Sequence, residues 1–396
     1  MKTIVQLAST FPRWENDTEP KFVYELCTKL TNEFNIIALV PHFSNAKTEE
    51  QMNGIKVIRF KYFFEKYQKL AYEGGIANNL KRNRLIALLI PFFLFFNLLS
   101  LIKLLKNNNI DAIHAHWIIP QGIIAILARF ISRKRIPILC TSHGGDLYCF
   151  NNWLTNKIKA FVLNRCEAIS VVSTAMKTDT SIYGIDAKKI HILPMGTDLI
   201  NKFYYDDTVT KKKNNILFVG RLVPKKGVDI LLQSLKYIPN NLIDFQLDII
   251  GDGPEKNHLE NLTRELKLNQ KVNFIGPKRY EELPIIYRQY PISVVPSVTA
   301  DNGDREGFGL VCVEAMGCGC TVVASNYGAI TDIISDGQTG VIVPQKSPQE
   351  LGKAISYLLS NPQKNKELSA NAIKSVQKFD WEHIGQRYSS LINSIS

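Results

Sequence analysis

The sequence predicts an α/β protein built from two doubly wound parallel sheets with a cleft between the two domains. Three observations lead to this prediction. The chain has 396 residues, which is more than a single hydrophobic core usually holds. Short apolar runs alternate with longer amphipathic stretches, a pattern typical of strand–helix–strand units. The alternation occurs twice, and a polar, charged segment at 196–213 separates the two series.

Each series of apolar runs predicts the strands of one sheet. The first series consists of TIVQLAS, NIIALVP, IKVIRF, DAIHAHW, PILCTS, AISVVS and KIHILP. The second consists of NILFVG, FQLDIIG, VNFIG, ISVVPS, CTVVAS and GVIVP. Domain boundaries fall in polar, exposed linkers, so we place the join near 195–213. We expect an N-terminal domain over residues 1–198 and a C-terminal domain over residues 199–380.

The composition excludes several classes of protein. Apolar residues make up 45% of the chain and charged residues 21%, which excludes disordered, collagen-like and disulfide-scaffold proteins. The net charge of +12 favours a polyanionic neighbour, which is nucleic acid, an anionic bilayer or a phosphorylated ligand. The seven cysteines lack zinc-site and CxxC spacings, so we expect reduced thiols in the cytosol.

Two segments are candidates for targeting or membrane contact. The N-terminus, MKTIVQLASTFPRW, reads as a first buried strand rather than a signal peptide. Residues Leu85 to Ile102 form 18 residues without a charge, which is the lower limit for a transmembrane helix. Pro91, Asn97 and Ser100 interrupt this apolar segment. Three interpretations stay open: a bilayer span, a wholly buried helix, or a helix with one face in the membrane surface.

The stretch just upstream, residues 56–84, is basic and aromatic. Its only acidic residues are Glu65 and Glu73. Its basic residues are Lys56, Arg59, Lys61, Lys66, Lys69, Lys81, Arg82 and Arg84, and among its aromatic residues are Tyr62, Phe63, Phe64, Tyr67 and Tyr72. Such a mixture suits an anionic lipid surface, so residues 56–105 become a candidate membrane-contact region. The alternative is a solvated hairpin and loop.

Four glycine-containing segments follow predicted strands. They are HGGD at 143–146, GRLVPKKG at 220–227, GDGPE at 251–255, and DREGFGLVCVEAMGCG at 304–319. Ligands of doubly wound sheets bind at the carboxyl ends of the strands. These four segments are therefore the places where we look for function.

Two glutamates in the last segment are the most informative residues. Glu306 precedes Gly307 and Gly309, which let a backbone approach a ligand closely. Glu314 lies within the apolar run LVCVEAM, where a buried carboxylate needs a partner. Eight residues along a helix span up to roughly 12 Å, which is longer than the separation of roughly 5–9.5 Å between glycosidase carboxyls. The pair therefore suits two ends of one elongated ligand, although each glutamate alone is also compatible with a cap or a surface carboxylate.

Cationic and imidazole groups follow two other strands. Arg221 and Lys226 follow NILFVG directly, where cations neutralise a diphosphate. Basic turns of this kind are common. Arg221 and Lys226 therefore indicate a ligand site only because three other candidate segments also follow strands. His143 follows PILCTS, where an imidazole reaches a reacting centre or serves a structural role. Asp146 orients that loop or caps the next helix, and His114 and His116, which alternate on one strand, rank below His143.

Taken together, these segments resemble the retaining glycosyltransferases of family 4, which have the GT-B fold of two facing Rossmann-like domains. Glu306 and Glu314 match the E-x7-E motif, and Arg221 and Lys226 match the phosphate-binding pair. The resemblance extends to bacterial surface-polysaccharide and cell-wall members through FPRWENDTEPKFVYEL, HAHWIIPQG, SHGGDLY and EAMGCGCTVVASNYGAITDIISDGQTGVIVP. One segment differs: STFPRW lacks the double glycine that many relatives have near the donor phosphate.

The resemblance implies a role for each matching residue. Glu314 bonds the ribose hydroxyls, Glu306 the donor sugar, and Arg221 and Lys226 the diphosphate, while His143 lines the reaction centre. The donor-binding set is Arg221, Lys226, Glu306, Gly307, Phe308, Gly309 and Glu314; His143 and Glu306 are the catalytic candidates, and Asp146 and Gly251 are secondary candidates. The N-terminal domain binds the acceptor and the C-terminal domain the donor. The last segment, 381–396, resembles the family's final helix, which crosses back to complete the first domain.

The predicted function is a retaining transfer of a sugar from a nucleotide-sugar donor to a polysaccharide or lipid-linked acceptor. We expect no metal and no other cofactor, because the cations neutralise the leaving diphosphate. The expected location is cytoplasmic and peripheral, on the inner face of the cell membrane, with no nucleic-acid partner. The alternatives are a nucleotide-sugar epimerase or a phosphorylase of the same architecture, and a non-catalytic module that binds anionic lipid or nucleic acid.

Overall fold

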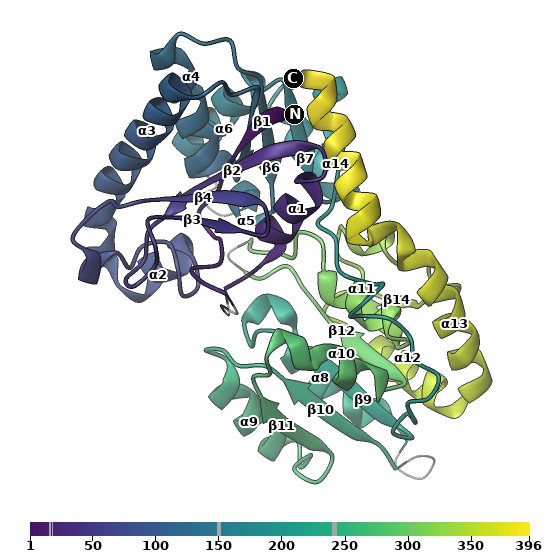
Figure 1. Cartoon of the computed structure of the whole chain (residues 1–396). Coiled ribbons are helices and arrows are strands. Elements are labelled where there is room, and N and C mark those ends of the chain that lie inside the picture. The colour runs from purple at the N-terminus through teal and green to yellow at the C-terminus, as the bar shows by residue number, and fades with distance from the viewer. Residues whose placement is uncertain (16, 18, 149–151, 240–243, 302) are drawn as a thin grey trace. The chain divides into compact units, whose positions relative to one another are not determined.

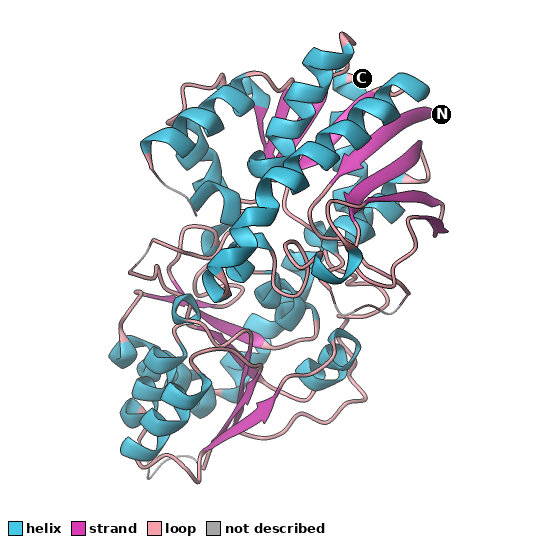
Figure 2. Ribbon diagram, turned by 90° about the vertical axis from the view of Figure 1, so that its left-hand side faces the viewer, coloured by secondary structure: helices cyan, strands magenta, loops and turns pink. Residues whose placement is uncertain are grey.

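The computed structural model describes the whole chain except residues 16, 18, 149–151, 240–243 and 302 (Figure 1). The chain forms two compact units. Unit 1 consists of Met1–Val172, Met176–Met195 and Trp381–Ser396, and unit 2 consists of Ser173–Ala175 and Gly196–Asp380. Each unit has its own sheet with helices against it (Figure 2). The predicted α/β class with two doubly wound domains is therefore confirmed.

Unit 1 contains an eight-stranded sheet in the order β3-β4-β2-β1-β5-β6-β7-β8. All neighbouring pairs are parallel except β3 with β4. The strands are β1 Lys2–Leu7, β2 Phe34–Pro41, β3 Glu49–Met52, β4 Ile55–Phe60, β5 Ala112–His116, β6 Ile138–Ser142, β7 Ala168–Val171 and β8 Ile190–Ile192. The seven apolar runs of the first series all form strands. Only the polar edge strand β3 lacks an apolar run, because a hairpin edge needs no two-sided burial.

Helices cover this sheet, and the last one comes from the far end of the chain. They are α1 Phe22–Leu30, α2 Ile76–Arg82, α3 Ile90–Asn107, α4 Ile123–Ser132, α5 Gly145–Tyr148, α6 Trp153–Asn164, α7 Thr174–Ser181 and α14 Trp381–Ile395. Helix α14 lies beside α1 (Figure 1), where the Trp381 indole donates to Glu25 at 2.9 Å. The Tyr388 hydroxyl donates to the Leu193 carbonyl at 2.9 Å. These contacts bind the C-terminal helix to unit 1.

Unit 2 contains a six-stranded, wholly parallel sheet in the order β11-β10-β9-β12-β13-β14. The strands are β9 Asn215–Val219, β10 Gln246–Ile250, β11 Val272–Gly276, β12 Ile292–Val295, β13 Thr321–Ser325 and β14 Val341–Val343. The helices are α8 Val228–Ser234, α9 Lys256–Glu265, α10 Leu283–Arg288, α11 Leu310–Gly317, α12 Pro348–Ser360 and α13 Pro362–Ser375. Apolar residues of β9, β10 and β12 pack against α8 and α12 in one core. Their burial on both faces explains why these strands read as continuous apolar runs.

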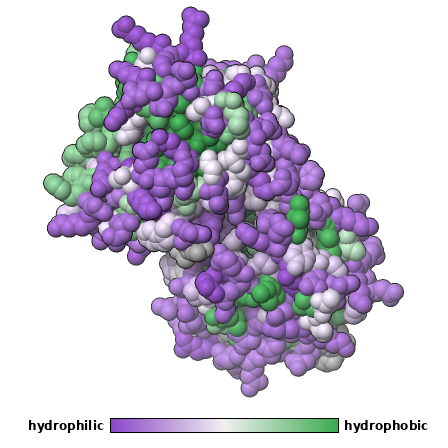
Figure 3. Space-filling view, viewed as in Figure 1, coloured by the Kyte–Doolittle hydropathy of each residue, from purple (hydrophilic) through white to green (hydrophobic). Residues whose placement is uncertain are grey.

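The apolar segment of the sequence forms α3 and the 3-10 turn before it, Arg84–Leu89. Helix α3 buries one face, formed by Phe93, Asn97, Leu101, Leu104 and Leu105. The opposite face exposes large apolar side chains, including Phe92, Phe95, Phe96 and Leu99, and apolar residues gather there in Figure 3. By length and composition the 84–107 helix is able to cross a membrane, and 17% of its most apolar window is buried. The interpretation as a wholly buried helix is therefore wrong.

The polar residue in the middle of α3 faces the protein. Asn97 is 0% exposed, and its side-chain amide donates to Gln121 Oε1 at 2.9 Å. Gln121 in turn donates to the Ser9 hydroxyl at 2.7 Å. A buried amide needs such partners. The link therefore fixes which side of α3 packs on unit 1 and which side is left exposed.

The basic and aromatic stretch before α3 is less exposed than the sequence suggested. Arg59 is 3% exposed, and its guanidinium pairs with Glu50 at 2.6 Å and donates to the Pro12 carbonyl at 2.9 Å. Tyr62 and Tyr72 are also buried, whereas Phe64 and Tyr67 are exposed. The expectation that this whole stretch offers its cations and rings to a lipid surface is wrong for the three buried residues. They stabilise unit 1 instead.

Candidate functional site

Both sheets have a topological switch point, where strands on either side lead away in opposite directions. In unit 2 the switch point lies between β9 and β12, and in unit 1 it lies between β1 and β5. Loops that leave the carboxyl ends of the strands at such points form the ligand sites of doubly wound sheets. The predicted site residues lie on these loops, on the next loop along the sheet or, for Glu314, in the helix that follows the loop after β12.

The switch point of unit 2 brings two predicted residues together across 80 positions of sequence. Lys226 Nζ lies 2.6 Å from Glu306 Oε2. The neighbouring pair, Lys225 and Asp304, is joined at 3.1 Å. Burial alone raises the pKa of Glu306, but Lys226 and then Lys225 outweigh it, so that the pKa lies below its usual value. Glu306 is therefore an anion at neutral pH, and Lys226 holds it in place.

Glycine makes the close approach of these loops possible. Lys226 ends a 3-10 turn, Pro224–Lys226, and Gly227 follows it with a φ of +62°. A Cβ at Gly227 would lie 2.1 Å from the Pro296 carbonyl oxygen, just past β12. Only glycine allows both this backbone conformation and this contact. Gly227 therefore packs the lysine-bearing turn against the end of β12.

The secondary candidate Gly251 has a structural place in the same region. Its φ is +144°, and a Cβ there would lie 1.9 Å from the Gly220 carbonyl oxygen. The Gly220 N–H donates to the Ile250 carbonyl at 3.0 Å. The GDGPE segment thus packs against the turn that carries Arg221, whose side chain is exposed. Gly251 supports the backbone of that turn.

The glycine-rich loop after β12 leads into the N-terminus of α11. Gly309, at the N-cap of α11, has a φ of +103° and approaches Tyr327, whose hydroxyl donates to the Phe308 carbonyl at 3.1 Å. Gly307 and Phe308 are buried, and the Phe308 ring packs edge-on against Phe379 at 5.3 Å. The Cys312 N–H donates to the Gly309 carbonyl at 2.9 Å, which leaves the N–H groups of Leu310 and Val311 at the end of the helix where anions bind.

Glu306 and Glu314 differ in their structural setting. Helix α11 begins at Leu310, so Glu306 lies in the preceding loop, and a spacing measured along a helix does not apply to the pair. Glu314 lies within α11 and is 5% exposed. Its Oε1 accepts a hydrogen bond from the Tyr280 hydroxyl at 3.3 Å. The sequence indicated that Glu314 needs a partner, but it gave no sign that Tyr280 fills this role.

His143 and Asp146 lie in unit 1, at the end of β6. Asp146 accepts hydrogen bonds from the Ile118 N–H at 2.6 Å, the Ser142 hydroxyl at 2.9 Å and the His143 N–H at 3.2 Å. Burial raises the pKa of Asp146, although these hydrogen bonds act in the opposite direction. Asp146 therefore links the loop that carries His143 to the loop after β5.

The His143 ring continues a buried hydrogen-bonded chain. His143 Nε2 lies 3.1 Å from His116 Nδ1, and His116 Nε2 lies 3.0 Å from Gln6 Oε1. Because an amide oxygen only accepts, His116 donates from Nε2, and its Nδ1 accepts the proton of His143 Nε2. Burial lowers the pKa of both imidazoles. His116, ranked below His143 from the sequence, therefore sets the tautomer of a neutral His143.

Two family models match the chain. The model described as Glycosyltransferase Family 4 matches residues 21–200, and the model described as Glycosyl transferases group 1 matches residues 205–375. Together they span most of the sequence. The second match lies within unit 2.

Individual relatives agree with the family models. An uncharacterized glycosyltransferase of Methanocaldococcus jannaschii is 29% identical over 84% of this chain and 89% of its own length. The GDP-mannose-dependent alpha-(1-6)-phosphatidylinositol monomannoside mannosyltransferase of Mycolicibacterium smegmatis is 25% identical over 74% of this chain and 78% of its own.

Solved structures show the same fold. Sucrose-phosphate synthase from Thermosynechococcus elongatus aligns with a TM-score of 0.78 at 21% identity, covering 100% of this chain and 99% of that one. Anabaena HepE in complex with UDP aligns with a TM-score of 0.76 at 20% identity, covering 100% of both chains. The chain therefore belongs to the family 4 glycosyltransferases and has their GT-B fold of two Rossmann-like domains.

Proposed function

We propose that this glycosyltransferase transfers a sugar from a nucleotide-diphosphate sugar to a glycan or lipid-linked acceptor, with retention of configuration at the anomeric carbon. The observation that carries the proposal is the ion pair of Lys226 with Glu306 at the switch point of unit 2, at 2.6 Å. It joins a cation suited to phosphate with a carboxylate suited to sugar hydroxyls. A nucleotide sugar needs both groups within one site.

The donor roles that the family resemblance implies are part of the proposal, and the positions of the side chains support them. Arg221, which is exposed, and Lys226, whose ammonium has donors beyond the one given to Glu306, neutralise the diphosphate. The amides at the start of α11, next to Gly309, add to this positive field. Glu306 holds the donor sugar. Glu314, buried and bonded by Tyr280, holds the ribose hydroxyls.

The reaction breaks one bond and forms one. The bond between the anomeric carbon and the diphosphate oxygen breaks, and its electron pair leaves with the nucleoside diphosphate. The acceptor hydroxyl oxygen forms the new bond to the same face of that carbon, and its proton passes to the leaving diphosphate. Arg221 and Lys226 stabilise the charge that grows on the phosphates in the transition state. His143, neutral and held by His116, lines the reaction centre.

A membrane-peripheral location on the inner face of the cell membrane is part of the proposal. The exposed face of α3 carries Phe92, Phe95, Phe96 and Leu99. Helix α4, which packs on α3, exposes Leu127, Phe130 and Ile131, and α6 exposes Trp153, Leu154 and Phe161. Three of these residues, Leu127, Phe130 and Phe161, line a groove together with Arg129, Arg133, Lys134, Arg135 and Arg165. Apolar side chains beside cations suit an anionic bilayer surface, and the sequence had pointed only to residues 56–105.

The experiment that tests the donor proposal is thermal-shift titration of the purified protein with UDP-, GDP- and ADP-sugars, followed by turnover with the donor that binds. HepE structures hold UDP or UDP-glucose, and a relative depends on GDP-mannose, so uridine and guanosine donors come first. A bound donor raises the melting temperature by mass action. Replacing Glu314 with Gln should abolish the shift and the turnover while leaving circular dichroism unchanged. Full activity in this variant would contradict the assignment.

Two further measurements test retention and location. Nuclear magnetic resonance of the first product should show the anomeric configuration of the donor, and an inverted product would overturn the retaining mechanism.

Flotation with anionic vesicles should recover the protein with lipid. The double variant Phe95→Ser and Phe96→Ser should lose most of this binding, whereas Tyr357→Ser, an exposed aromatic of unit 2, should not. Equal flotation of both variants would exclude α3 as the contact.

A further inference from the structure

Unit 1 contains an apolar cavity of about 430 Å³ at its own switch point. Ser9 and Thr10 after β1 line one wall, and Trp117, Ile119 and Pro120 after β5 line another. The volume lies within the range of roughly 300–1,000 Å³ that is typical of small-molecule sites. The carboxyl ends of strands at a switch point are also where such sheets bind ligands. Both facts mark the cavity as a ligand site.

The lining is hydrocarbon with few polar groups. The other walls come from Leu70, Ile76, Ile90, Phe93, Leu94 and Ile123. Asp146 also borders the cavity, but both of its oxygens already accept hydrogen bonds from the protein. The Ser9 hydroxyl accepts from Gln121. Because Asp146 and Ser9 already bond to the protein, the hydrocarbon lining favours a ligand that buries apolar surface.

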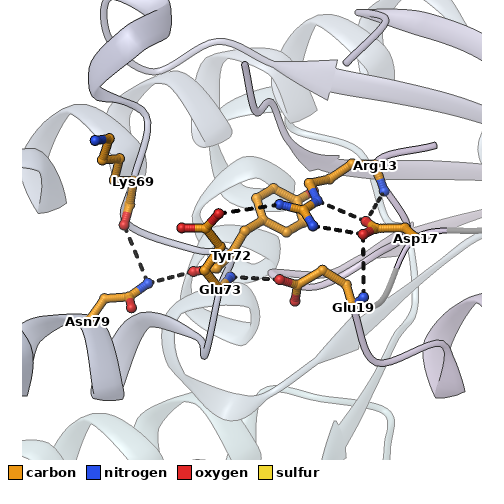
Figure 4. Close-up of polar contacts among 7 residues, drawn as sticks. All are labelled: Arg13, Asp17, Glu19, Lys69, Tyr72, Glu73 and Asn79. Carbon is orange, nitrogen blue, oxygen red and sulfur yellow. Dashed lines mark hydrogen bonds and ion pairs between the residues drawn. The ribbon is translucent and has the colours of Figure 1, made fainter. Parts of the chain in front are cut away.

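The wall formed by residues 70–76 is fixed in place by polar contacts (Figure 4). The Asn79 amide donates to the Tyr72 carbonyl at 2.6 Å and the Leu70 carbonyl at 3.1 Å. The Glu73 N–H donates to Glu19 at 2.6 Å. Arg13, bonded to Asp17 at 2.7 Å, lies 3.8 Å from the Glu73 carboxylate. The loop after β1 thus binds the cavity wall, so the cavity exists before any ligand enters.

The cavity adjoins the histidine that we place at the reaction centre. The Trp117 ring lines the cavity and lies 5.0 Å from the His143 ring. Asp146 borders the cavity and accepts the His143 N–H. A chain lying in the cavity therefore leaves its polar end beside His143. The residues of α3 that line the cavity lie on the face opposite Phe92, Phe95 and Leu99, so the same helix serves cavity and membrane face.

We propose that this cavity binds the hydrocarbon chain of the acceptor, so that the acceptor is a lipid-linked molecule rather than a free glycan. This inference rests on the proposed sugar transfer and narrows its acceptor to an amphiphile with an alkyl or prenyl chain. The chain occupies the cavity between α3 and the loop after β5. The headgroup hydroxyl then faces His143.

The test is calorimetric binding of methyl, hexyl and octyl glucosides below their micelle concentrations. In a site that buries the chain, affinity should rise about two- to fourfold for each added methylene, as expected from the transfer of CH₂ groups out of water. Methyl glucoside should bind weakly. Affinity that does not change with chain length would overturn the proposal, and this result needs no variant.

Matched variants on one helix locate the chain. Leu94→Trp fills the cavity and should weaken octyl glucoside binding by at least about tenfold, since several methylenes lose their burial. Leu99→Trp places the same ring on the exposed face of α3 and should bind like the parent protein. Ile123→Trp fills the cavity from α4 and replaces Leu94→Trp should that variant fail to fold. Parent-like octyl binding in a folded cavity variant would contradict the proposal.

Two controls separate this proposal from others. The thermal shift caused by the nucleotide donor reports on unit 2, so it should be the same in Leu94→Trp as in the parent protein. If the parent protein itself did not bind a donor, the proposed sugar transfer would be contradicted instead. Vesicle flotation should also stay unchanged in Leu94→Trp. If flotation fell in Leu94→Trp but not in Leu99→Trp, the cavity would hold a bilayer acyl chain, and the acceptor assignment would be wrong.

Discussion

The switch points of the two units occupy the same topological position but carry opposite chemistry. In unit 2 the loops after β9 and β12 bring Lys226 against Glu306, with Lys225 and Asp304 beside them. In unit 1 the loops after β1 and β5 enclose an apolar cavity next to a neutral histidine. Sheet topology places a ligand site in each unit. On our proposals, the side chains then select a charged ligand for unit 2 and an apolar ligand for unit 1.

The largest effect is expected from removing the cation of unit 2. Lys226→Ala leaves Glu306 without its partner and removes positive charge from the diphosphate, so kcat/KM should fall by about 10²–10³, as for other lost transition-state contacts. Steady-state kinetics with the donor that binds would measure this loss. Lys353→Ala, which removes an exposed lysine paired with Glu350 on α12, is the control and should be active. If both variants had the same kcat/KM, the assignment of Lys226 to the donor site would be wrong.

A second prediction concerns the backbone that supports the charged site. Gly251→Ala places a Cβ 1.9 Å from the Gly220 carbonyl oxygen, so the free energy of unfolding of unit 2 should fall by about 3 kcal/mol. Gly276→Ala is the matched control, because its φ of +84° is also strained but no atom lies within 4 Å. It should lose only about 1 kcal/mol. Urea unfolding followed by circular dichroism would compare the two variants. Similar losses would mean that Gly251 is required only for its positive φ and not for its close contact with Gly220.

The sequence predicted the strands and the charged loops because their signals are local. Strands buried on both faces read as continuous apolar runs, and Lys226, Glu306 and Glu314 lie in short glycine-containing motifs. The ion pair of Lys226 with Glu306 needs one more fact, which is that β9 and β12 are neighbours. Tyr280 could not be predicted as the partner of Glu314, since it lies 34 residues upstream in a turn with no motif.

The apolar cavity is different, because no local signal marks it. Ser9, Leu70, Phe93 and Trp117 come from four separate segments of unit 1, and each reads alone as an ordinary core or loop residue. One signal in α3 was nevertheless present. Asn97 shares the helical face of Phe93 and Leu101, and a polar residue that needs a partner indicates the face packed on protein. That spacing was enough to predict which face of the helix is exposed.

The two units should also respond differently to acid. Burial lowers the pKa of His114, which is 0% exposed, to about 3, whereas an unfolded histidine titrates near 6.5. Between these values the unfolded state binds the extra proton, so the stability of unit 1 falls as the pH falls below about 6.5, by about 1.4 kcal/mol per pH unit for each such histidine. In unit 2 the pKa of Glu306 is lowered by folding. The stability that this shift contributes is therefore lost only when the pH falls below about 4.5.

The tryptophans make this measurement specific, because Trp14, Trp117, Trp153 and Trp381 all belong to unit 1. Urea unfolding followed by tryptophan fluorescence between pH 7 and pH 4.5 should show the loss. The variant His114→Gln should be less stable at pH 7 but should lose stability less steeply on acidification. An unchanged pH slope in that variant would show that His114 does not carry the effect.

The smallest expected effect is that of removing divalent metal ions. In the donor site that we propose for unit 2, Arg221 and Lys226 supply the charge that a metal would otherwise supply to a leaving diphosphate, and the ion pair with Glu306 holds Lys226 in position. Turnover should therefore change by less than about twofold when EDTA is added. The Lys226→Ala variant gives a sharper test. If Mg²⁺ partly restores the rate of this variant but does not accelerate the parent protein, then the lysine supplies the positive charge that a metal ion would supply to the diphosphate. A parent enzyme that loses most of its activity in EDTA and regains it with Mg²⁺ would instead show that the lysine and arginine charges are insufficient.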